Sequence, residues 1–587
     1  MDDIEVNRMA LFDHVKRSKR GGQVSPPIND LGGNSLRSDK AKAEAFQEKF
    51  MGVFQEHEYV KHEWSMGATL VDLDLNPVKL RKRLGRMKRG SAPGIDTLGP
   101  ALYKESPFVV FEALSHLYQF CLDNDQLPIE WMIVKVIPLW KNSGSKADIN
   151  KYRPVSLGST AWKLFEAMYL DGINKLSEDQ EAYGKNQHGF RAKHSTVTNL
   201  TEYWDHVTKS MDKGKRVHVL NLDMSSAFDT VNIDGILDGL ERIGLGGNLG
   251  RLLEAWLKNR FQYVELNGEK SSIGRVNSGV QQGSLTGPAL FNLATSRLTS
   301  RLEAAGVRTW KYADDLKAVF TIDNHIDHQQ VQDGIDHLVK AASEAGLKFN
   351  SAKSTLMSFG RKKDPFEFEF HIDGEAIPRV QEACDLGVVF QSNLNFGSTL
   401  ARNLKKSLAI VHIIRATIKV RSFDLLNKIY QSYFLPIITY GSEIFTSEKA
   451  TVKKVMHKGY RAFWRLGGGR MHIDNKILDP FQVCILKELM FFKRVQMEKT
   501  CLNFGELFSF ADTQGTRAFQ NHDLKTVGTT RCPRYNFFSN VCTRLYNDLD
   551  PAKRNLGTLG SFKAEVLRMI NDKFPTPNYD LSPKMRV

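Results

Sequence analysis

An α+β fold is predicted for this chain of 587 residues from its composition and from two patterns along it. Hydrophobic residues make up 41% and charged residues 25%, which is typical of a packed globular protein. Between about residues 90 and 360, short β-rich runs such as WMIVKVIPLW, RVHVLNLD and KYADDLKAVF alternate with helical segments. After about residue 398 the sequence becomes mostly helical and basic. We therefore expect a layered domain of helices and sheets, followed by a helical part.

Residues 1–85 are predicted to form an N-terminal extension. They begin with a polar, Gly- and Ser-containing stretch that suits a flexible chain, followed by KAEAFQEKFMGVFQEH, whose apolar spacing suits a helix. The basic cluster RKRLGRMKRG then leads into SAPGIDTLGP, where Pro93, Gly94, Gly99 and Pro100 forbid a continuous helix. We place the first domain boundary here.

The positive charge lies in the C-terminal part. The net charge is +15, and residues 401–587 contain 31 basic and 15 acidic residues, so the rest of the chain is nearly neutral. Between Ala401 and Arg470 there are 14 basic and 3 acidic residues on a segment with helical apolar spacing. A charged helix face is often only solvated, but this density favours a surface that binds nucleic-acid phosphates.

Membrane and disulfide classes are not favoured. No stretch approaches the roughly 18 to 20 apolar residues that cross a bilayer, and the first residues lack the plan of a secretion signal. We expect no membrane partner and an intracellular location, in the nucleus or the cytoplasm. The six cysteines lie far apart without the C-x2-4-C spacing of structural zinc sites, which predicts reduced core residues.

Three aspartates carry the predicted chemistry. RVHVLNLD reads as a strand that ends at Asp223, and KYADDLKAVF reads as a β-hairpin with Asp314 and Asp315 at its tip. Carboxylates on neighbouring strand ends suit two Mg²⁺ ions that bridge a nucleoside triphosphate and an attacking hydroxyl. Adjacent strand residues point to opposite faces, so we expect Asp223 and Asp314 as primary metal ligands and Asp315 as a supporting one. The predicted reaction is nucleotidyl transfer with Mg²⁺, for which Mn²⁺ can substitute.

Nine segments, in order along the chain, then resemble the reverse transcriptase of non-LTR retrotransposons, the LINE-like and jockey-like mobile elements. They are KRGSAPGIDTLGP (88–100), KYRPVSLGSTAWKLFEAMYLDGI (151–173), QHGFRAKHSTVTNL (187–200), LDMSSAFDTV (222–231), GVQQGSLTGPALFNL (279–293), YADD (312–315), GLKFNSAKSTLM (346–357), DLGVVF (385–390) and YGSEIF (440–445). In the first segment, Leu98 and Gly99 shift the glycine of the family pattern.

The resemblance implies a right-hand polymerase and its activity. Fingers over 86–215, a palm with an antiparallel sheet over 216–395 and a basic helical thumb over 396–475 would precede a region of unassigned role, 476–587. The implied enzyme is an RNA-directed DNA polymerase, in which a primer 3′-OH attacks the α-phosphate of a dNTP. Its implied partners are an RNA template, a DNA primer and dNTPs, and also the element's own RNA in a ribonucleoprotein.

Roles for further residues follow by matching positions. Phe228 lies where the family places an aromatic wall beneath the incoming sugar, and a ring there would collide with a ribose 2′-OH. Gln282 and Gly283, with Ser284, form a turn that approaches the nucleotide and the template base. Arg153 would bind triphosphate oxygens, Lys141 would be a second triphosphate cation, and Lys353 would donate a proton to leaving pyrophosphate. A solvated surface lysine remains an alternative for Lys141, and a lysine at a helix start for Lys353.

The thumb would contact a template-primer duplex through cations. The residues expected to bind nucleic acid are Arg402, Lys405, Lys406, Lys453, Lys454, Lys458, Arg461 and Arg465.

Two other readings stay open. An RNA-templated RNA polymerase would share the palm and the two-metal chemistry, whereas Phe228 and the YADD hairpin favour a reverse transcriptase over the Gly-Asp-Asp of many RNA replicases. A catalytically silent RNA-binding protein of the same fold would lose the carboxylates, and all three are present. Neither the 85 residues before the fingers nor the C-terminal cysteines fit an endonuclease, so that activity would be lost or supplied by another polypeptide or a pre-existing nick. No four-carboxylate array predicts an RNase H domain.

Overall fold

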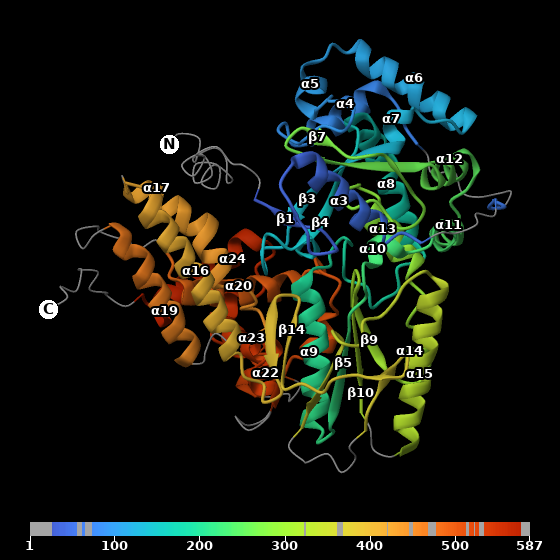
Figure 1. The fold of residues 1–587 in the computed structure, drawn as a ribbon. Helices are drawn as coiled ribbons and strands as arrows, with labels where there is room; N and C mark the ends of the chain where they lie inside the picture. The colour runs from blue at the N-terminus through green and yellow to red at the C-terminus, as the bar shows by residue number, and fades with distance from the viewer. Residues whose placement is uncertain are drawn as a thin grey trace.

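The computed structural model describes residues 26–55, 61–64, 73–321, 325–360, 368–419, 421–444, 450–467, 477–511, 516–521, 523–526 and 533–576. Mixed helices and sheets confirm the predicted α+β class, and Figure 1 shows how they are arranged around a central sheet.

The central sheet has four antiparallel strands. Their order is β11 (Thr355–Phe359), β5 (Val217–Leu222), β10 (Asp315–Phe320) and β9 (Arg308–Tyr312). The hairpin predicted over KYADDLKAVF is the β9–β10 pair, in which Asp315 is opposite Tyr312. β10 also pairs with β5, so that Leu316 is opposite Leu222. The end of β5 and the start of β10 therefore lie side by side.

This sheet separates two hydrophobic cores because its side chains alternate between its two faces. Leu220 of β5 and Ala318 of β10 belong to the first core. Val219 of β5 and Val319 of β10 belong to the second. Both faces are therefore covered, and the strands read as nearly continuous apolar runs.

The first core is completed by helices from the N-terminal and middle parts of the chain. Buried aromatic rings, among them Trp162, Trp131 and Trp256, pack against one another within it. Its helices are α4 (Pro77–Gly85), α5 (Pro100–Glu105), α6 (Val109–Asn124), α7 (Ile129–Met132), α8 (Thr160–Asp179), α10 (Ala227–Thr230), α11 (Ile233–Arg242), α12 (Gly247–Lys258), α13 (Gly287–Ala294), α14 (Ser300–Ala304) and α15 (His325–Glu344).

A second sheet lies beside the first core. It contains β4 (Tyr152–Leu157), β3 (Ile133–Trp140), β6 (Arg260–Leu266), β7 (Glu269–Lys270) and β8 (Gly274–Val276), and a separate pair is formed by β1 (Ile28–Asn29) and β2 (Ser35–Leu36). Helix α3 (Asp39–Met51) packs on β6, where Gln47 Nε2 donates to Gln262 O at 3.1 Å. Helix α3 is thus tied to this sheet, whereas α4 belongs to the first core. Of the stretch predicted to be flexible, residues 17–25 lie outside the described residues, and residues 26–40 contain β1, β2 and the start of α3.

The second core joins α9 (Thr196–Asp212) to the C-terminal helices, which lie on the other side of the molecule in Figure 1. These are α16 (Gly397–Thr417), α17 (Phe423–Ile429), the π-helical turn η2 (Tyr430–Phe434), α18 (Leu435–Ile438), α19 (Ala450–Trp464), η3 (Arg465–Gly467), α20 (Pro480–Gln496), α21 (Phe504–Leu507), α22 (Arg517–Gln520), η4 (Pro533–Asn536), α23 (Phe538–Asn547), η5 (Pro551–Lys553) and α24 (Leu559–Lys573). Short hairpins β12–β13 (His371–Ile372, Glu375–Ala376) and β14–β15 (Glu382–Asp385, Val388–Gln391) and the 3₁₀ turn η1 (Ile149–Lys151) complete the described elements.

The described residues after 476 are part of this second core rather than a loose tail. Helix α20 packs against α19, α23 and α24. On α9, the buried carboxylate of Asp205 accepts hydrogen bonds from Arg534 at 2.7 Å and from Ser539 at 2.9 Å. The C-terminal region is therefore fixed to the helix that covers the central sheet.

The expectations about membrane spans and cysteines can be compared with the described residues. Among them, no helix is long and apolar enough to cross a membrane. Cys121, Cys484 and Cys542 are buried free thiols, as predicted, but Cys384 is exposed and Cys501 only half-buried. The prediction that all cysteines are core residues is thus wrong for Cys384, and Cys532 lies outside the described residues.

Candidate active site

The three predicted aspartates lie at one end of the central sheet. Asp223 directly follows β5, Asp314 is in the two-residue turn between β9 and β10, and Asp315 begins β10. Because Leu316 pairs with Leu222, the next position along each strand brings Asp315 beside Asp223. Three carboxylates from two distant segments of the chain therefore meet where adjacent strands end.

Buried polar contacts hold the hairpin turn in place. Ala313 has φ +57°, a left-handed conformation that a two-residue hairpin turn requires. The fully buried Gln187 accepts hydrogen bonds through Oε1 from Ala313 N at 3.0 Å and from Gly189 N at 2.8 Å. A side chain at Gly189 would place its Cβ 2.5 Å from Ala313 N. The segment QHGFR thus packs directly on the turn that carries Asp314, a function that its sequence alone did not reveal.

Asp223 is positioned by the stretch before β11. Asn350 N donates to Asp223 O at 2.9 Å, and Asp223 N donates to Ser354 Oγ at 3.2 Å. Lys353, in the same turn, places its Nζ 3.4 Å from Asp223 Oδ2. The predicted proton donor therefore lies beside a predicted metal ligand, in a turn rather than at a helix start.

The electrostatics of the carboxylates are unfavourable in the absence of a bound cation. Burial, and then the charge of Asp223, raises the pKa of Asp314, although Arg153 opposes this shift. Burial, followed by the charges of Asp314 and Asp385, raises the pKa of Asp315 to about 6. Asp223 Oδ2 makes no hydrogen bond, and its neighbour of opposite charge is the exposed Lys353 at 3.4 Å. Clustered carboxylates of this kind, one of them with an oxygen that makes no hydrogen bond, are suited to bind a hard divalent cation such as Mg²⁺.

Three predicted cations gather next to these carboxylates. Arg153 projects from β4, and its positive charge acts on Asp314. Lys141 follows β3, where its backbone N donates to Lys151 O at 2.7 Å. Burial lowers the pKa of Lys141, and the charges of Arg153 and Lys353 lower it further, so the three cations lie near one another. Like charges held together in this way are suited to bind a polyphosphate.

Phe228 lies on the same side of the sheet, in α10. Its ring stacks on Phe291 of α13, with centroids 4.5 Å apart, and meets the edge of Phe190 at 6.3 Å. Phe228 O also accepts a hydrogen bond from Val280 N at 2.7 Å. The ring is half-buried and fixed from behind, as a wall against a substrate would have to be.

The loop with Gln282 and Gly283 packs between α10 and β4. Gln282 Nε2 donates to both carboxylate oxygens of Asp229, at 2.8 and 2.9 Å. Gly283 has φ +117°, and a Cβ there would lie 2.6 Å from Ser156 O, so only glycine fits. Burial raises the pKa of Asp229 to about 6, against the effect of Gln282. Asp229 is a site residue that sequence reasoning missed.

Comparison with known proteins agrees with this geometry. Residues 141–382 match the family model described as reverse transcriptase (RNA-dependent DNA polymerase). This stretch of the chain is therefore similar to a reverse transcriptase domain.

Similar proteins come from retrotransposons of Drosophila melanogaster. The RNA-directed DNA polymerase from mobile element jockey is 23% identical over 493 residues, which are 80% of this chain and 53% of that protein. The probable RNA-directed DNA polymerase from transposon BS is 23% identical over 74% of this chain and 50% of its own length. The corresponding protein of transposon X-element is 24% identical over 80% and 54%. The predicted resemblance to non-LTR retrotransposons is confirmed, and the chain spans about half the length of these relatives.

Among solved structures, an apo telomerase from Candida tropicalis, truncated from its C-terminal domain, aligns with 10% identity and a TM-score of 0.33. That alignment covers 49% of this chain and 60% of the telomerase chain. The likeness is too weak to support any detail of the fold.

A cation outside the predicted set supports this stretch from α3. Lys49 Nζ donates to Ile149 O and, at 3.4 Å, to Tyr152 O, in the loop that follows Lys141. Burial, and then the charge of Lys141, lowers the pKa of Lys49 to about 8. No pattern in the sequence indicated this role, because a lysine in a helix is ordinarily solvated.

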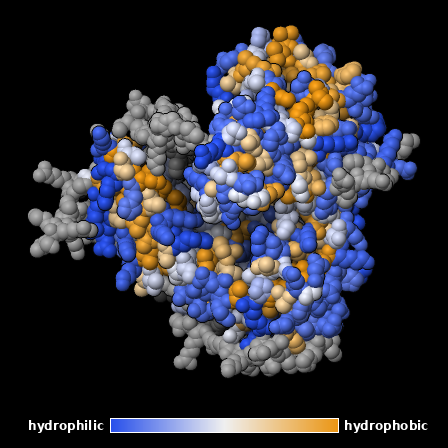
Figure 2. All heavy atoms as spheres, in the orientation of Figure 1, coloured by the Kyte–Doolittle hydropathy of each residue, from blue (hydrophilic) through white to orange (hydrophobic). Residues whose placement is uncertain are grey.

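Seven of the eight cations predicted to bind nucleic acid lie on the helical group of α16 and α19, and Arg465 begins the turn η3 that follows α19. In Figure 2 hydrophilic residues line the outer edge of this group. Seven of the eight are exposed: Lys405, Lys406, Lys453, Lys454, Lys458, Arg461 and Arg465. Arg402 is half-buried, and its Nη1 donates to Cys384 Sγ at 3.2 Å. Arg402 is therefore the member of the set that points to protein rather than to solvent.

Proposed function

We propose that this chain is the RNA-directed DNA polymerase of a non-LTR retrotransposon, a nucleotidyltransferase that adds dNMP to a primer 3′-OH on an RNA template. The observation that carries the proposal is the meeting of three carboxylates and three cations at one end of the central sheet, inside the stretch that is similar to a reverse transcriptase domain. The partners are an RNA template, a DNA primer and dNTPs, with the element's RNA as the source of a ribonucleoprotein.

Asp223 and Asp314, supported by Asp315, would hold Mg²⁺, for which Mn²⁺ can substitute. When bound, the metal ions activate the primer hydroxyl and offset the charge on pyrophosphate. The protein's own part is positioning and electrostatics. The buried oxygen of Asp223 that lacks a hydrogen-bond partner, and the raised pKa of Asp314, support this assignment.

Arg153 and Lys141 would bind the triphosphate. The guanidinium of Arg153 can bind two phosphate oxygens at once, and its exposed position on β4 leaves it available. Lys353 Nζ would donate a proton to the leaving pyrophosphate oxygen. Its place 3.4 Å from Asp223 Oδ2 keeps that proton beside the reacting groups.

Phe228 would exclude ribonucleotides, and the loop of Gln282 and Gly283 would lie against the template base and the incoming nucleotide. The stacking of Phe228 on Phe291 supports the first role, because a ring that could move aside would not discriminate between ribose and deoxyribose. The hydrogen bonds from Gln282 to Asp229 support the second, because they fix the loop to the turn that carries Phe228.

The division into fingers (86–215), palm (216–395), thumb (396–475) and a C-terminal region (476–587) is part of the proposal. The central sheet with the aspartates falls within the palm, and α16 to α19 fall within the thumb. The exposed cations of the thumb would face the phosphates of the template-primer duplex. About 6 to 10 such contacts would make duplex binding fall by orders of magnitude between low and physiological salt.

Primer extension tests the reaction. The substrates are poly(rA)/oligo(dT) and a heteropolymeric RNA template with Mg²⁺, and dNTPs are compared with rNTPs. We expect Mg²⁺-dependent incorporation of dNTPs by the wild type and none by Asp314→Ala. Asp333→Ala, on the exposed face of α15, is the matched control and should retain activity. A preference for rNTPs would indicate an RNA replicase, and absent synthesis with intact, salt-sensitive duplex binding would indicate a silent RNA-binding protein.

The sugar filter has its own test. Phe228→Ala should raise the use of rNTPs relative to dNTPs by at least about tenfold, which corresponds to about 1.4 kcal/mol. Phe190→Ala removes the exposed neighbouring ring while the wall remains, so its selectivity should match that of the wild type. Equal selectivity in all three proteins would remove Phe228 from the sugar site.

A further inference from the structure

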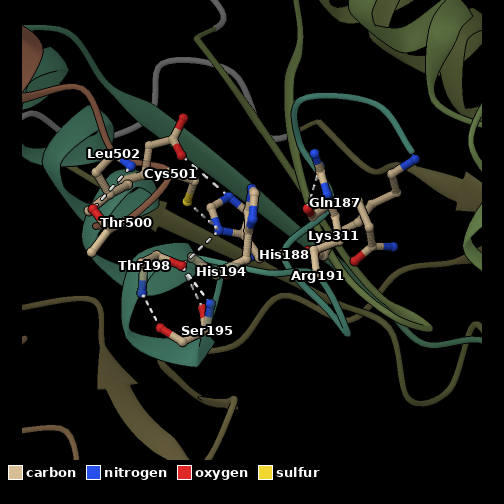
Figure 3. Close-up of polar contacts among 12 residues, drawn as sticks. Gln187, His188, Arg191, His194, Ser195, Thr198, Lys311, Thr500, Cys501 and Leu502 are labelled. Atoms are coloured by element: carbon tan, nitrogen blue, oxygen red, sulfur yellow. Dashed lines mark hydrogen bonds and ion pairs between the residues drawn. The ribbon is translucent and has the colours of Figure 1, made fainter. Parts of the chain in front are cut away.

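A cluster of two histidines and a cysteine lines a second cavity, away from the aspartates. The cavity of about 450 Å³ lies between α9, the loop before it and the stretch that follows α20. Figure 3 shows the rings of His188 and His194 turned toward the sulfur of Cys501. One potential ligand atom from each of the three side chains lies within 4.8 Å of the others. The two histidines and the cysteine are more than 300 positions apart in the sequence.

The surroundings of His188 leave one of its ring nitrogens as an available lone pair. Nε2 lies 3.3 Å from the Glu202 carboxylate without a hydrogen bond, and a carboxylate beside it favours the ring proton on Nε2. Nδ1 lies 3.0 Å from Thr198 Oγ1. The Thr198 hydroxyl, however, already donates its hydrogen to Ser195 O at 2.8 Å. With its hydrogen directed to Ser195 O, Thr198 does not donate to Nδ1, so Nδ1 of this buried ring is available to a metal ion when Nε2 carries the proton.

Cys501 is the remaining neighbour of that lone pair. Its Sγ lies 3.8 Å from His188 Nδ1, which is long for a hydrogen bond. A tetrahedral zinc ion with ordinary Zn–N and Zn–S bond lengths would separate such a nitrogen and sulfur by about 3.6 Å. The observed separation is thus closer to that of two ligands of one ion than to a strong thiol–imidazole bond.

His194 presents its own lone pair in the same way. Its Nδ1 lies 2.7 Å from Ala192 O, and since a carbonyl only accepts, Nδ1 carries the proton and Nε2 is free to bind a metal. In His194 a carbonyl oxygen holds one ring nitrogen as a donor, and in His188 a carboxylate lies beside one ring nitrogen. An oxygen acceptor next to the nitrogen that does not bind the metal is common for metal-binding histidines.

We propose that His188, His194 and Cys501 bind a zinc ion, with the fourth position open to the cavity. Two imidazoles and a thiolate are ligands that zinc accepts readily, whereas Mg²⁺ prefers oxygen, so this site would be distinct from the aspartate site. The Cys501 thiol would release its proton to solvent as the Zn–S bond forms.

Such an ion would tie the C-terminal region to the hairpin that carries Asp314. Cys501 N already donates to Lys193 O at 3.2 Å, and His188 N donates to Lys311 O of β9 at 2.9 Å. Gln187, next to His188, holds the turn at Ala313. The zinc site would thus give the stretch after α20 a structural role, independently of the function proposed above.

The test uses the full chain, first stripped of metal with a chelator and then titrated with Zn²⁺ or Co²⁺. We expect one tightly bound ion and, with Co²⁺, the strong visible bands of a tetrahedral site together with a thiolate charge-transfer band. Cys501→Ser and His194→Gln should lose both. Cys384→Ser and His116→Gln replace an exposed cysteine and an exposed histidine, and both should bind as the wild type does.

A second measurement keeps the proposal testable if a variant folds poorly. In the wild type, Zn²⁺ should raise the midpoint of thermal unfolding by several degrees and slow amide exchange in 187–194 and 497–507 together, whereas Mg²⁺ should do neither. The proposal is overturned if the wild type binds no Zn²⁺ at micromolar concentrations. It is equally overturned if Cys501→Ser binds Zn²⁺ as tightly as the wild type, since the cluster would then be a plain thiol–imidazole contact.

Discussion

The carboxylates at the end of the central sheet and the carboxylate of Asp205 on α9 have opposite surroundings. Asp223 has a buried oxygen without a hydrogen-bond partner and one exposed lysine at 3.4 Å. Asp205 is 7% exposed and has Lys209 and Arg534, both at 2.7 Å, and Ser539 at 2.9 Å. Asp205, which joins two parts of the fold, thus has three partners for its carboxylate. Asp223, where we propose that a metal ion binds, has a single exposed lysine as its partner.

The charges of the two regions also act differently on folding. Burial and like charges raise the pKa values of Asp314 and Asp315, so these groups oppose folding when they are ionised. The ion pairs of Asp205 act in favour of folding, because they compensate its burial. Removing a carboxylate should therefore have opposite consequences in the two regions.

The largest expected effect is on synthesis. Asp223→Asn should lower primer extension by at least about 10³-fold, because a metal ligand is lost and each tenfold is about 1.4 kcal/mol of barrier. The free energy of unfolding should change by less than about 1 kcal/mol, since an exposed ion pair contributes little. Rate and denaturant unfolding are measured on the same preparation, with Asp333→Asn as the control. A parallel loss of rate and stability would contradict the contrast.

The second effect concerns the joint between α9 and the C-terminal region. Asp205→Asn keeps the size of the side chain but leaves the nearly buried guanidinium of Arg534 without its ionic partner. We expect the free energy of unfolding to fall by about 3 kcal/mol. Lys209→Gln, which removes only the half-exposed partner, should cost less. If Asp205→Asn were as stable as the wild type in urea, the ion pairs would not hold this joint.

Much of the site could be predicted from the sequence because its signals are local. Strand alternation before Asp223 and the apolar runs around Asp314 are patterns within ten residues, and they correctly indicated a strand end and a hairpin. That the two carboxylate segments are neighbours followed from the resemblance, not from periodicity. The register that brings Asp315 beside Asp223 could not be predicted from the sequence, because strand pairing joins residues about 90 positions apart.

The contacts that were missed are all long-range. Gln187 at the turn, Asp229 beneath Gln282 and Lys49 beside Lys141 are ordinary polar residues in their own segments. A search for zinc ligands by C-x2-4-C spacing could not find Cys501 with His188, because its ligands come from opposite halves of the chain. The packing of the C-terminal helices was also missed, because an apolar helix face does not indicate which distant segments it will pack against.

The third effect is the dependence of stability on pH that follows from the buried carboxylate of Asp229. The pKa of Asp229, at about 6, lies above its ordinary value. Between about pH 4 and 6 the folded state therefore binds more protons than the unfolded state, so stability falls as pH rises through this window and is then constant. Asp229→Asn should make that decline smaller by about 3 kcal/mol and be more stable than the wild type above pH 6. The raised pKa values of Asp314 and Asp315 account for the decline that remains. Urea unfolding at pH 4, 5, 6 and 7 measures it, and an unchanged decline in the variant would be the contrary result.

The smallest effect separates two cations on α16. Lys406 is exposed, whereas Arg402 is half-buried and donates to Cys384 Sγ. If the thumb binds duplex phosphates, Lys406→Gln should lower the slope of log affinity against log salt by about 1. Arg402→Gln should leave that slope unchanged, because a side chain directed at protein releases no counterion. Fluorescence anisotropy with an RNA/DNA duplex at several salt concentrations measures both. Equal slopes for Lys406→Gln and the wild type would move the nucleic-acid surface away from this face of α16.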